Sequence, residues 1–309
     1  MTQEQIISST LNKTAKMRLL FDLGLTRNQV AELLGTNYGF AFNVHKKWAE
    51  AQLNTRISAS LTNFQFNHTF GVEIEAFGIK MQELETELRN AGINTNAEGY
   101  NHQTRDHWKI VRDASLQGAN SFEIVSPKLQ GEDGLRQLKT VLLITRGLEA
   151  KTNKSCGVHI HFDASNFELE TWKNLYKNYA NLETWIDGFM PASRRGNSNS
   201  YCHTMKVENY KTKIDNAVNL REIESNITNQ SRYYKLNTQS FWRQNSVEFR
   251  QHGASVSFEK ISNWIKFLAR LIEISKRTEI ENADDVNLRR FLNNDLINYF
   301  QNRTRELAA

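Results

Sequence analysis

The stretch that decides the fold is CGVHIHFD, residues 156–163, in which apolar and polar side chains alternate with a period of two. Residues two apart on a β-strand point to the same side, so His159 and His161 face one way and the valine and isoleucine beside them face the other. Such alternation predicts a strand with one face packed on a core. The polar face carries imidazoles, where an ordinary solvated strand carries threonine, serine and lysine.

Three further segments alternate in the same way and are predicted strands: FGVEIEAF (70–77), FEIVSP (122–127) and SVEFRQHG (246–253). Their polar faces collect carboxylates and cations: Glu73, Glu75, Glu123, Glu248, Arg250 and His252. If the four strands pair in one sheet, these side chains converge on one surface, with Asp113 nearby from a preceding loop. A single Glu-x-Glu or His-x-His pair is usually a solvated strand face, but four such strands together favour a functional site.

Helix-periodic segments separate and follow the strands, over residues 78–93, 132–151, 166–190, 257–277 and 284–303. The composition is that of a globular chain, with 309 residues of which 39% are hydrophobic and 24% charged.

The same composition limits where the protein works. No apolar run approaches the roughly 18 residues needed to span a bilayer, and the N-terminus lacks the basic start and apolar stretch of a secretory signal. Two cysteines, Cys156 and Cys202, exclude a disulfide framework. A cytoplasmic location without membrane contact is therefore the simplest expectation.

The N-terminal segment differs from the rest of the chain. Residues 13–24, 26–35 and about 36–48 each have helical periodicity and are separated by glycine-containing turns, which is the pattern of a helix-turn-helix. Residues 1–56 hold seven Lys/Arg and four Asp/Glu, so more than half of the net charge of +5 lies there. With a polar linker at 54–63, we predict a helical unit over 1–56 and a second domain over 57–309, with a core at 66–275 and C-terminal helices at 258–307.

Two interpretations of this helical unit stay open. It contacts DNA through its third helix, with Lys46, Lys47 and Arg27 on phosphates. Alternatively it is a helical cap or protein-docking module, with Phe40, Phe42 and Val44 in its core. In the first case the unit either makes the protein a regulator or brings an enzyme to a nucleic acid substrate.

The converging carboxylates have a chemical consequence. Up to five negative charges cannot all stay ionised side by side, so either pKa values rise or cations bind. Hard Mg²⁺ prefers carboxylate oxygens and keeps part of its shell for water or phosphate, which indicates a nucleotide. Arg250 is placed to meet a phosphate or a developing oxyanion.

Six segments in a fixed order resemble the amidoligase family of carboxylate–amine ligases, within the glutamine synthetase and gamma-glutamylcysteine synthetase superfamily. They are GVEIE (71–75), WKIVRDASL (108–116), FEIVSP (122–127), CGVHIHFD (156–163), PASRRGNSNSYC (191–202) and SVEFRQHGAS (246–255). The resemblance covers about residues 66–275. It implies an α+β fold, in which a curved antiparallel sheet with flanking helices forms a glutamine synthetase-like domain, beside the small all-α N-terminal unit.

The resemblance also implies an activity. ATP phosphorylates a substrate carboxylate with two or three Mg²⁺ ions, and an amine displaces phosphate to leave an amide, with release of ADP and phosphate. Its metal-binding positions are Glu73, Glu75, Glu123, His159 and Glu248. Its nucleotide-binding and catalytic positions are His161, Arg250, Arg194, Arg195, Asn237, Glu75 and Asp113. Trp108 falls at a family-like position too, or is a packing residue.

Several rival interpretations remain. Arg194 and Arg195 form a substrate or phosphate clamp, or a solvated loop. Cys156 is a candidate thiol nucleophile, although no dedicated base is evident. His159 and His161 are alternatively zinc ligands of a hydrolase, which the surplus of carboxylates disfavours. In a further interpretation, the ligase-like domain only senses a metabolite and the protein is a DNA-binding regulator. The acid and amine substrates are not specified, because the loops around 92–107 and 191–240 build their pockets.

Overall fold

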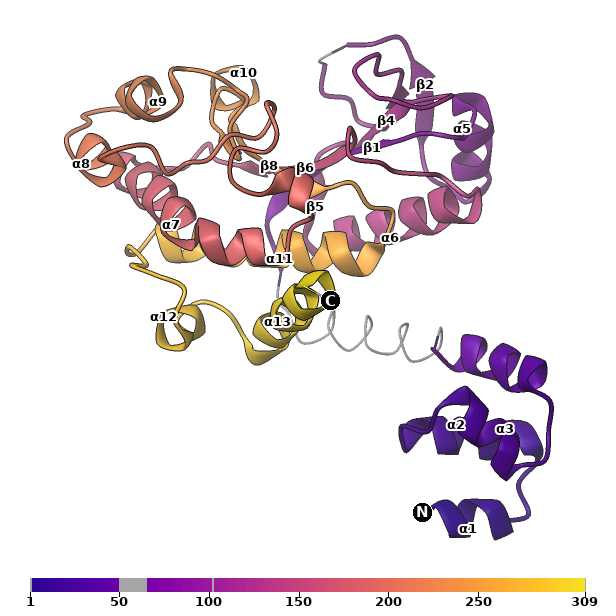
Figure 1. The fold of residues 1–309 in the computed structure, drawn as a ribbon. Coiled ribbons are helices and arrows are strands. Elements are labelled where there is room, and N and C mark those ends of the chain that lie inside the picture. The colour runs from indigo at the N-terminus through magenta and orange to yellow at the C-terminus, as the bar shows by residue number, and fades with distance from the viewer. Residues whose placement is uncertain (1, 50–65, 102, 309) are drawn as a thin grey trace. The chain divides into compact units, whose positions relative to one another are not determined.

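The computed structural model describes residues 2–49, 66–101 and 103–308. The chain divides into two compact units, Met1–Gln65 and Phe66–Ala309 (Figure 1). The predicted boundary at 56/57 and the predicted linker at 54–63 lie outside the described residues.

The N-terminal unit is helical, as predicted. Over its described residues 2–49, the elements are α1 (Gln3–Ser8), α2 (Lys13–Asp22), α3 (Arg27–Leu33) and a helix over 38–49. Their apolar sides form a small core of Ile6, Met17, Leu20, Phe21, Val30 and Val44. Val44 is thus a core residue, whereas Phe40 and Phe42 are 39% and 42% exposed, so the expectation that all three are core is wrong for the two phenylalanines.

All four predicted strands form and lie next to one another in a single sheet. They are β4 (Phe122–Val125), β1 (Thr69–Ala76), β6 (Gly157–Asp163) and β8 (Ser246–Gly253), and each adjacent pair is antiparallel. Shorter strands complete the order β2-β3-β4-β1-β6-β8-β7, with β5 on β1: β2 (Thr95–Glu98), β3 (Trp108–Val111), β5 (Leu129–Gln130) and β7 (Leu236–Asn237). The expected antiparallel pairing holds for the central strands, while β2 and β3 at one edge run parallel, so the sheet as a whole is mixed.

Helices flank the sheet, which confirms the α+β class. Four predicted helices are α5 (Met81–Asn90), α6 (Gly131–Gly147), α7 (Leu169–Gly188) and α11 (Phe258–Ser275). The segment predicted as one helix over 284–303 forms two, α12 (Asp285–Arg289) and α13 (Asn294–Ala308). Asn293 between them accepts the N–H of Leu296 at 3.0 Å and so starts a new helix.

The connection between α7 and β8 holds short elements that periodicity does not reveal. They are a 3-10 turn, η1 (Ala192–Arg194), and the helices α8 (Tyr210–Asp215), α9 (Leu220–Thr228) and α10 (Phe241–Gln244). No helix among the described residues is long and apolar enough to cross a membrane.

The core of the second unit lies between the sheet and the helices α6, α7 and α11, which run along one side of it (Figure 1). Val72, Ile74, Val158 and Ile160 are fully buried on that side, as their alternation predicts. Burying each of these side chains contributes about 1.5–3 kcal/mol. This energy fixes the strand register, and the register in turn directs the intervening polar side chains to the opposite face.

A β-bulge in β8 overturns one predicted side-chain direction. Val158 of β6 pairs with His252, whereas Ile160 pairs with Phe249, so β8 holds one extra residue between these two pairs. His252 therefore shares a side with an apolar residue, and its ring centroid lies 5.9 Å from that of Trp264 in α11. The prediction that it joins the carboxylates on the polar face is wrong, because alternation alone cannot register a bulge.

This displaced histidine should make stability depend on pH. Burial lowers the pKa of His252 to about 4, from an ordinary value of 6.5. Between about pH 4 and pH 6.5, His252 is protonated in the unfolded chain but neutral in the folded protein. The free energy of unfolding therefore decreases as the pH falls from 6.5 toward about 4. Because the ring is partly exposed, we expect a loss of about 1–2 kcal/mol in the free energy of unfolding between about pH 7.5 and pH 5. Urea denaturation at both pH values should show a correspondingly smaller loss in His252→Gln; equal losses would contradict the assignment.

Candidate active site

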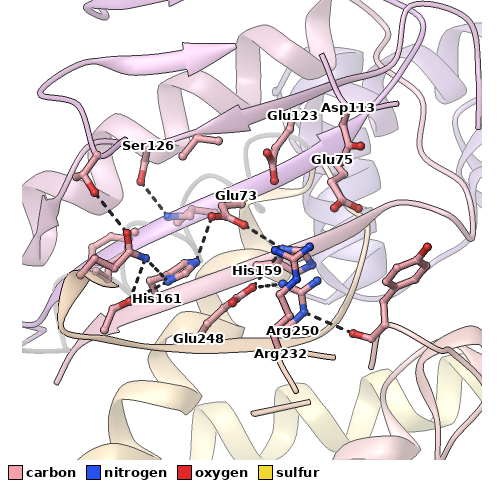
Figure 2. Close-up of a pocket in the computed structure, with 18 of the residues that line it drawn as sticks. Glu73, Glu75, Asp113, Glu123, Ser126, His159, His161, Arg232, Glu248 and Arg250 are labelled. Carbon is pink, nitrogen blue, oxygen red and sulfur yellow. Dashed lines mark hydrogen bonds and ion pairs between the residues drawn. The ribbon is translucent and has the colours of Figure 1, made fainter. Parts of the chain in front are cut away.

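The register of three strand pairs assembles the predicted carboxylates and histidines (Figure 2). Glu73 of β1 pairs with His159 of β6, and Glu75 of β1 pairs with Glu123 of β4. On the other side of β6, His161 pairs with Glu248 of β8. Paired residues in antiparallel strands point to the same face, so these six side chains share one surface although their segments are far apart in sequence.

Glu73 is the central group of this surface. Its carboxylate lies 3.1 Å from Nδ1 of His159 and 3.2 Å from Nε2 of His161. Burial alone would raise the pKa of Glu73, but the positive charge of His161 and the hydrogen bonds of both histidines hold the pKa well below its usual value. For His161 burial has the opposite effect and would lower the pKa. The negative charge of Glu73 outweighs burial and raises the pKa of His161. The two groups therefore stabilise each other's charged forms.

Glu248 and Arg250 form the second part of the site. Nη1 of Arg250 contacts Oε1 of Glu248, and Nε of Arg250 donates to the carbonyl oxygen of Tyr201 at 3.4 Å. Glu248 also accepts a hydrogen bond from Asn237, which is buried in β7. Burial opposes ionisation of Glu248, but the charges of Arg250 and His161 lower its pKa.

Glu75 and Glu123 lie at the other end of the surface, where compensation is incomplete. Burial raises the pKa of Glu123 well above its usual value, and the charges of Glu73, Glu75 and Asp113 add to this. Burial also raises the pKa of Glu75, although His159 and the backbone N–H of Gly157 oppose it. Glu75 and Glu123 therefore resist ionisation, which is one of the two outcomes expected of a carboxylate cluster.

Asp113 lies beside this end of the surface (Figure 2). Its Oδ1 accepts the backbone N–H of Ser115 at 2.8 Å and the hydroxyl of the same residue at 2.7 Å. These bonds fix the carboxylate at the start of the loop after β3.

The two predicted arginines occupy different environments. Arg194 is buried and lines the cavity, but its Nη2 donates to the carbonyl of Cys156 at 2.7 Å and its Nη1 to that of Arg250 at 3.4 Å. It therefore links the residue just before β6 to β8. Arg195 does not line the cavity, and its Nε donates to the carbonyl of Met190 at 2.8 Å. The structure thus brings only the first of them to the site.

The site opens into a cavity of about 1590 Å³. A pocket for a single small ligand typically measures roughly 300–1000 Å³, so this one has room for more than one substrate. Sequence reasoning missed several lining residues: Tyr100, Lys109, Ser126, Tyr201, Arg232 and Arg243. Lys109 could have been found, since it alternates with Trp108 and Ile110 on the short strand β3. Trp108 itself is buried, as a packing residue would be.

Among the residues that the structure describes, two groups of three side chains have the spacing of metal ligands. One is Glu73, Glu123 and His159, and the other is Glu73, His161 and Glu248; the ligand atoms of each lie within 4.8 Å of one another. Carboxylate oxygens predominate, and a bound cation would relieve the repulsion that raises the pKa of Glu123. These residues fit one or two divalent cations, with Glu73 shared.

The thiol of Cys156 does not line the cavity, and burial raises its pKa. A thiolate nucleophile needs a lowered pKa and access to substrate. The structure therefore disfavours the interpretation of Cys156 as a nucleophile.

A comparison with protein families decides where this arrangement belongs. The model of the family described as "Putative amidoligase enzyme" matches residues 67–272, which is more than half of the chain. The chain belongs to this amidoligase family. Membership makes it a ligase-type enzyme and confirms the resemblance drawn from the six segments. No curated protein gives a significant match.

The amidoligase match begins just before β1 and ends within α11. It therefore includes the strands β1, β4, β6 and β8 and both groups of possible metal ligands. The N-terminal unit lies outside the match. Whatever that unit does is an addition to the amidoligase domain.

Proposed function

We propose that the protein is an ATP- and Mg²⁺-dependent carboxylate–amine ligase, which activates an acid as its acyl phosphate, forms an amide, and releases ADP and phosphate. The observation that carries the proposal is the shared face of β1, β4, β6 and β8. It places four glutamates, two histidines and one arginine in a single cavity. In an amidoligase, such a surface suits an anionic nucleotide bound through cations.

The residues for the cations follow from the two ligand groups. Glu73, Glu123 and His159 would hold one Mg²⁺, and Glu73, His161 and Glu248 another. When bound, Mg²⁺ neutralises the charge of the triphosphate and orients its terminal phosphoryl group. Glu75 belongs to neither group. It stands beside Glu123 and is free for another role.

Arg250 supplies the fixed positive charge that phosphoryl transfer needs. Its Nη1 faces Glu248 and its Nε faces the Tyr201 carbonyl, and these contacts orient the guanidinium along the cavity wall. Nη2 then serves an oxygen of the transferring phosphoryl group. A cation held ready in this way stabilises the charge that develops in the transition state without reorganisation.

Glu75 and Asp113 are placed to receive the amine. Both line the cavity, and Glu75 sits where burial raises its pKa. A carboxylate of raised pKa is a better proton acceptor near neutral pH. We assign to Glu75 the proton that the amine loses as it displaces phosphate, and to Asp113 the charge that attracts the amine.

The test is product analysis with pools of candidate acids and amines. Incubation with ATP and Mg²⁺ should release ADP and phosphate in equal amounts, together with a product whose mass equals acid plus amine minus water. The Glu248→Gln variant should give neither. Release of AMP and pyrophosphate would contradict the proposal, as would a hydrolysed acid derivative without net ATP use, which would support the metal-dependent hydrolase instead.

A further inference from the structure

The helix over 38–49 of the N-terminal unit is packed on one side only. Ala41 and Val44 are buried, and Trp48 packs against the same small core. These positions recur at intervals of three and four residues, which places them along one face of a helix. Within the described residues of the N-terminal unit, the side chains on the opposite face are exposed.

The composition of this opposite face is unusual for a solvated surface. Its centre, by helical spacing, is Gly39, Asn43 and Lys46, with Phe40 and Lys47 beside them. The helix over 38–49 contains no acidic residue. Polar, cationic and aromatic side chains without a carboxylate are complementary to a polyanion that also presents apolar groups.

Arg27 of α3 extends the same face. Its guanidinium lies 5.8 Å from the ring centre of Tyr38 and 5.4 Å from that of Phe42. The nearby acid Asp22 is directed elsewhere, since it accepts the indole N–H of Trp48 at 2.9 Å. Arg27, Lys46 and Lys47 therefore supply positive charge around the exposed face, while Asp22 is engaged by Trp48.

Gly39 gives independent support. A Cβ at this position would meet only Oδ1 of Asn37, at 3.4 Å, so the fold does not exclude a side chain there. Its φ is not positive either. Glycine is a poor helix former, and neither packing nor backbone geometry requires it here. Its use at the centre of the exposed face suits the close approach of another molecule.

The geometry of the helix pair indicates what that molecule is. α3 ends at Leu33, and a four-residue turn over 34–37 with Gly35 at φ +54° leads into the next helix. Oδ1 of Asn37 caps that helix by accepting the N–H of Phe40 at 2.8 Å. Two helices joined by a short glycine-containing turn are the arrangement in which the second helix enters the DNA major groove.

We propose that this face binds duplex DNA, with the helix over 38–49 in the major groove. Lys46, Lys47 and Arg27 contact phosphates, and Asn43 contacts a base edge, where an asparagine can pair with adenine. Gly39 lets the start of the helix approach the groove. This function is separate from ligation, and its test does not depend on ligase activity.

The test measures binding of the full-length protein to a labelled duplex of mixed sequence by fluorescence anisotropy, over a range of salt concentrations. Charge reversal in Lys46→Glu/Lys47→Glu should weaken binding by at least about tenfold and reduce the slope of log K against log salt by about two. The matched control, Arg277→Glu/Arg305→Glu, makes the same charge change at exposed positions of the other unit and should bind within about twofold of wild type.

Gly39→Gln separates binding from folding. Glutamine favours a helix over glycine, so thermal stability should stay the same or rise, whereas binding should weaken by about tenfold or more because the side chain fills the contact surface. Asn43→Ala should reduce the preference for a duplex selected from random sequences by roughly 5- to 150-fold.

Three outcomes would overturn the proposal. One is no binding of any duplex by the full-length protein at low salt. Another is an equal loss of duplex affinity in the lysine variant and in its control, which would mean that the duplex responds to net charge and not to this face. The third is that a protein partner competes with the duplex by binding to Phe40 and Phe42, and that the Lys46→Glu/Lys47→Glu variant binds this partner as well as wild type does. The face would then be a protein-docking surface.

Discussion

Glu73→Gln is expected to abolish ligase turnover, with a loss of at least about 1000-fold, because this one carboxylate belongs to both groups of possible metal ligands. Glutamine keeps the size of the side chain but removes its charge. Nδ1 of His159 and Nε2 of His161 then lose the anion that lies 3.1 Å and 3.2 Å from them. Both cation sites should weaken together, whereas loss of any other member should weaken one.

The measurement is ADP release under saturating substrates, with Mn²⁺ binding followed by electron paramagnetic resonance as a separate readout. Wild type should bind Mn²⁺ in the cavity, and Glu73→Gln should lose most of that binding while keeping its circular dichroism spectrum. Glu83→Gln, an exposed carboxylate on α5 outside the cavity, is the matched control and should stay within about twofold of wild type. Normal turnover in Glu73→Gln would refute the shared-ligand assignment.

Arg250→Ala should lower kcat by about 1000-fold, with a smaller change in the KM for ATP. Removing one preorganised donor from a developing oxyanion costs roughly 100- to 1000-fold, and an arginine that stabilises phosphoryl transfer contributes 1000-fold or more. Arg250→Lys should recover part of the rate, because lysine keeps the charge but loses the fork of N–H groups that lies between Glu248 and the Tyr201 carbonyl.

Arg195→Ala is the matched control for this prediction. Both arginines were predicted from the same resemblance, but Arg195 does not line the cavity. Its removal should change kcat by no more than about threefold. Because Arg250→Ala also leaves Glu248 buried without its partner, thermal denaturation of each variant is needed to separate lost catalysis from lost folding. If kcat for Arg195→Ala is as low as that for Arg250→Ala, the loop that carries Arg195 reaches the substrate.

Alternation in four short segments was enough to predict the centre of the sheet and the face on which its chemistry lies. Val158 and Ile160 must be buried, so His159 and His161 must point the other way. The same logic applies to Glu73 between Val72 and Ile74. This part of the fold could be predicted because a period of two is a local property that survives any choice of strand neighbours.

Other features depended on contacts that no local pattern encodes. The bulge that turns His252 toward α11 is one extra residue in one strand, visible only when β6 and β8 are aligned. The strands β2 and β3 have only four residues each, and alternation within them does not show that they pair with each other in parallel. The different fates of Arg194 and Arg195 follow from which backbone carbonyls lie within reach.

The sequence by itself determined that this chain would form a polar-faced sheet, that carboxylates and imidazoles would share that face, and that a basic helical segment would precede it. It could do so because side-chain alternation, helical period and charge are properties of neighbouring residues. Only the tertiary structure decided that Glu73 stands between both histidines, that Glu248 is held by Asn237 and Arg250, and that burial and neighbouring carboxylates raise the pKa of Glu123. These relations join residues as far apart in the chain as Glu123 and Glu248, which are 125 positions apart. They arise from strand order and register, which the packing of the whole core selects.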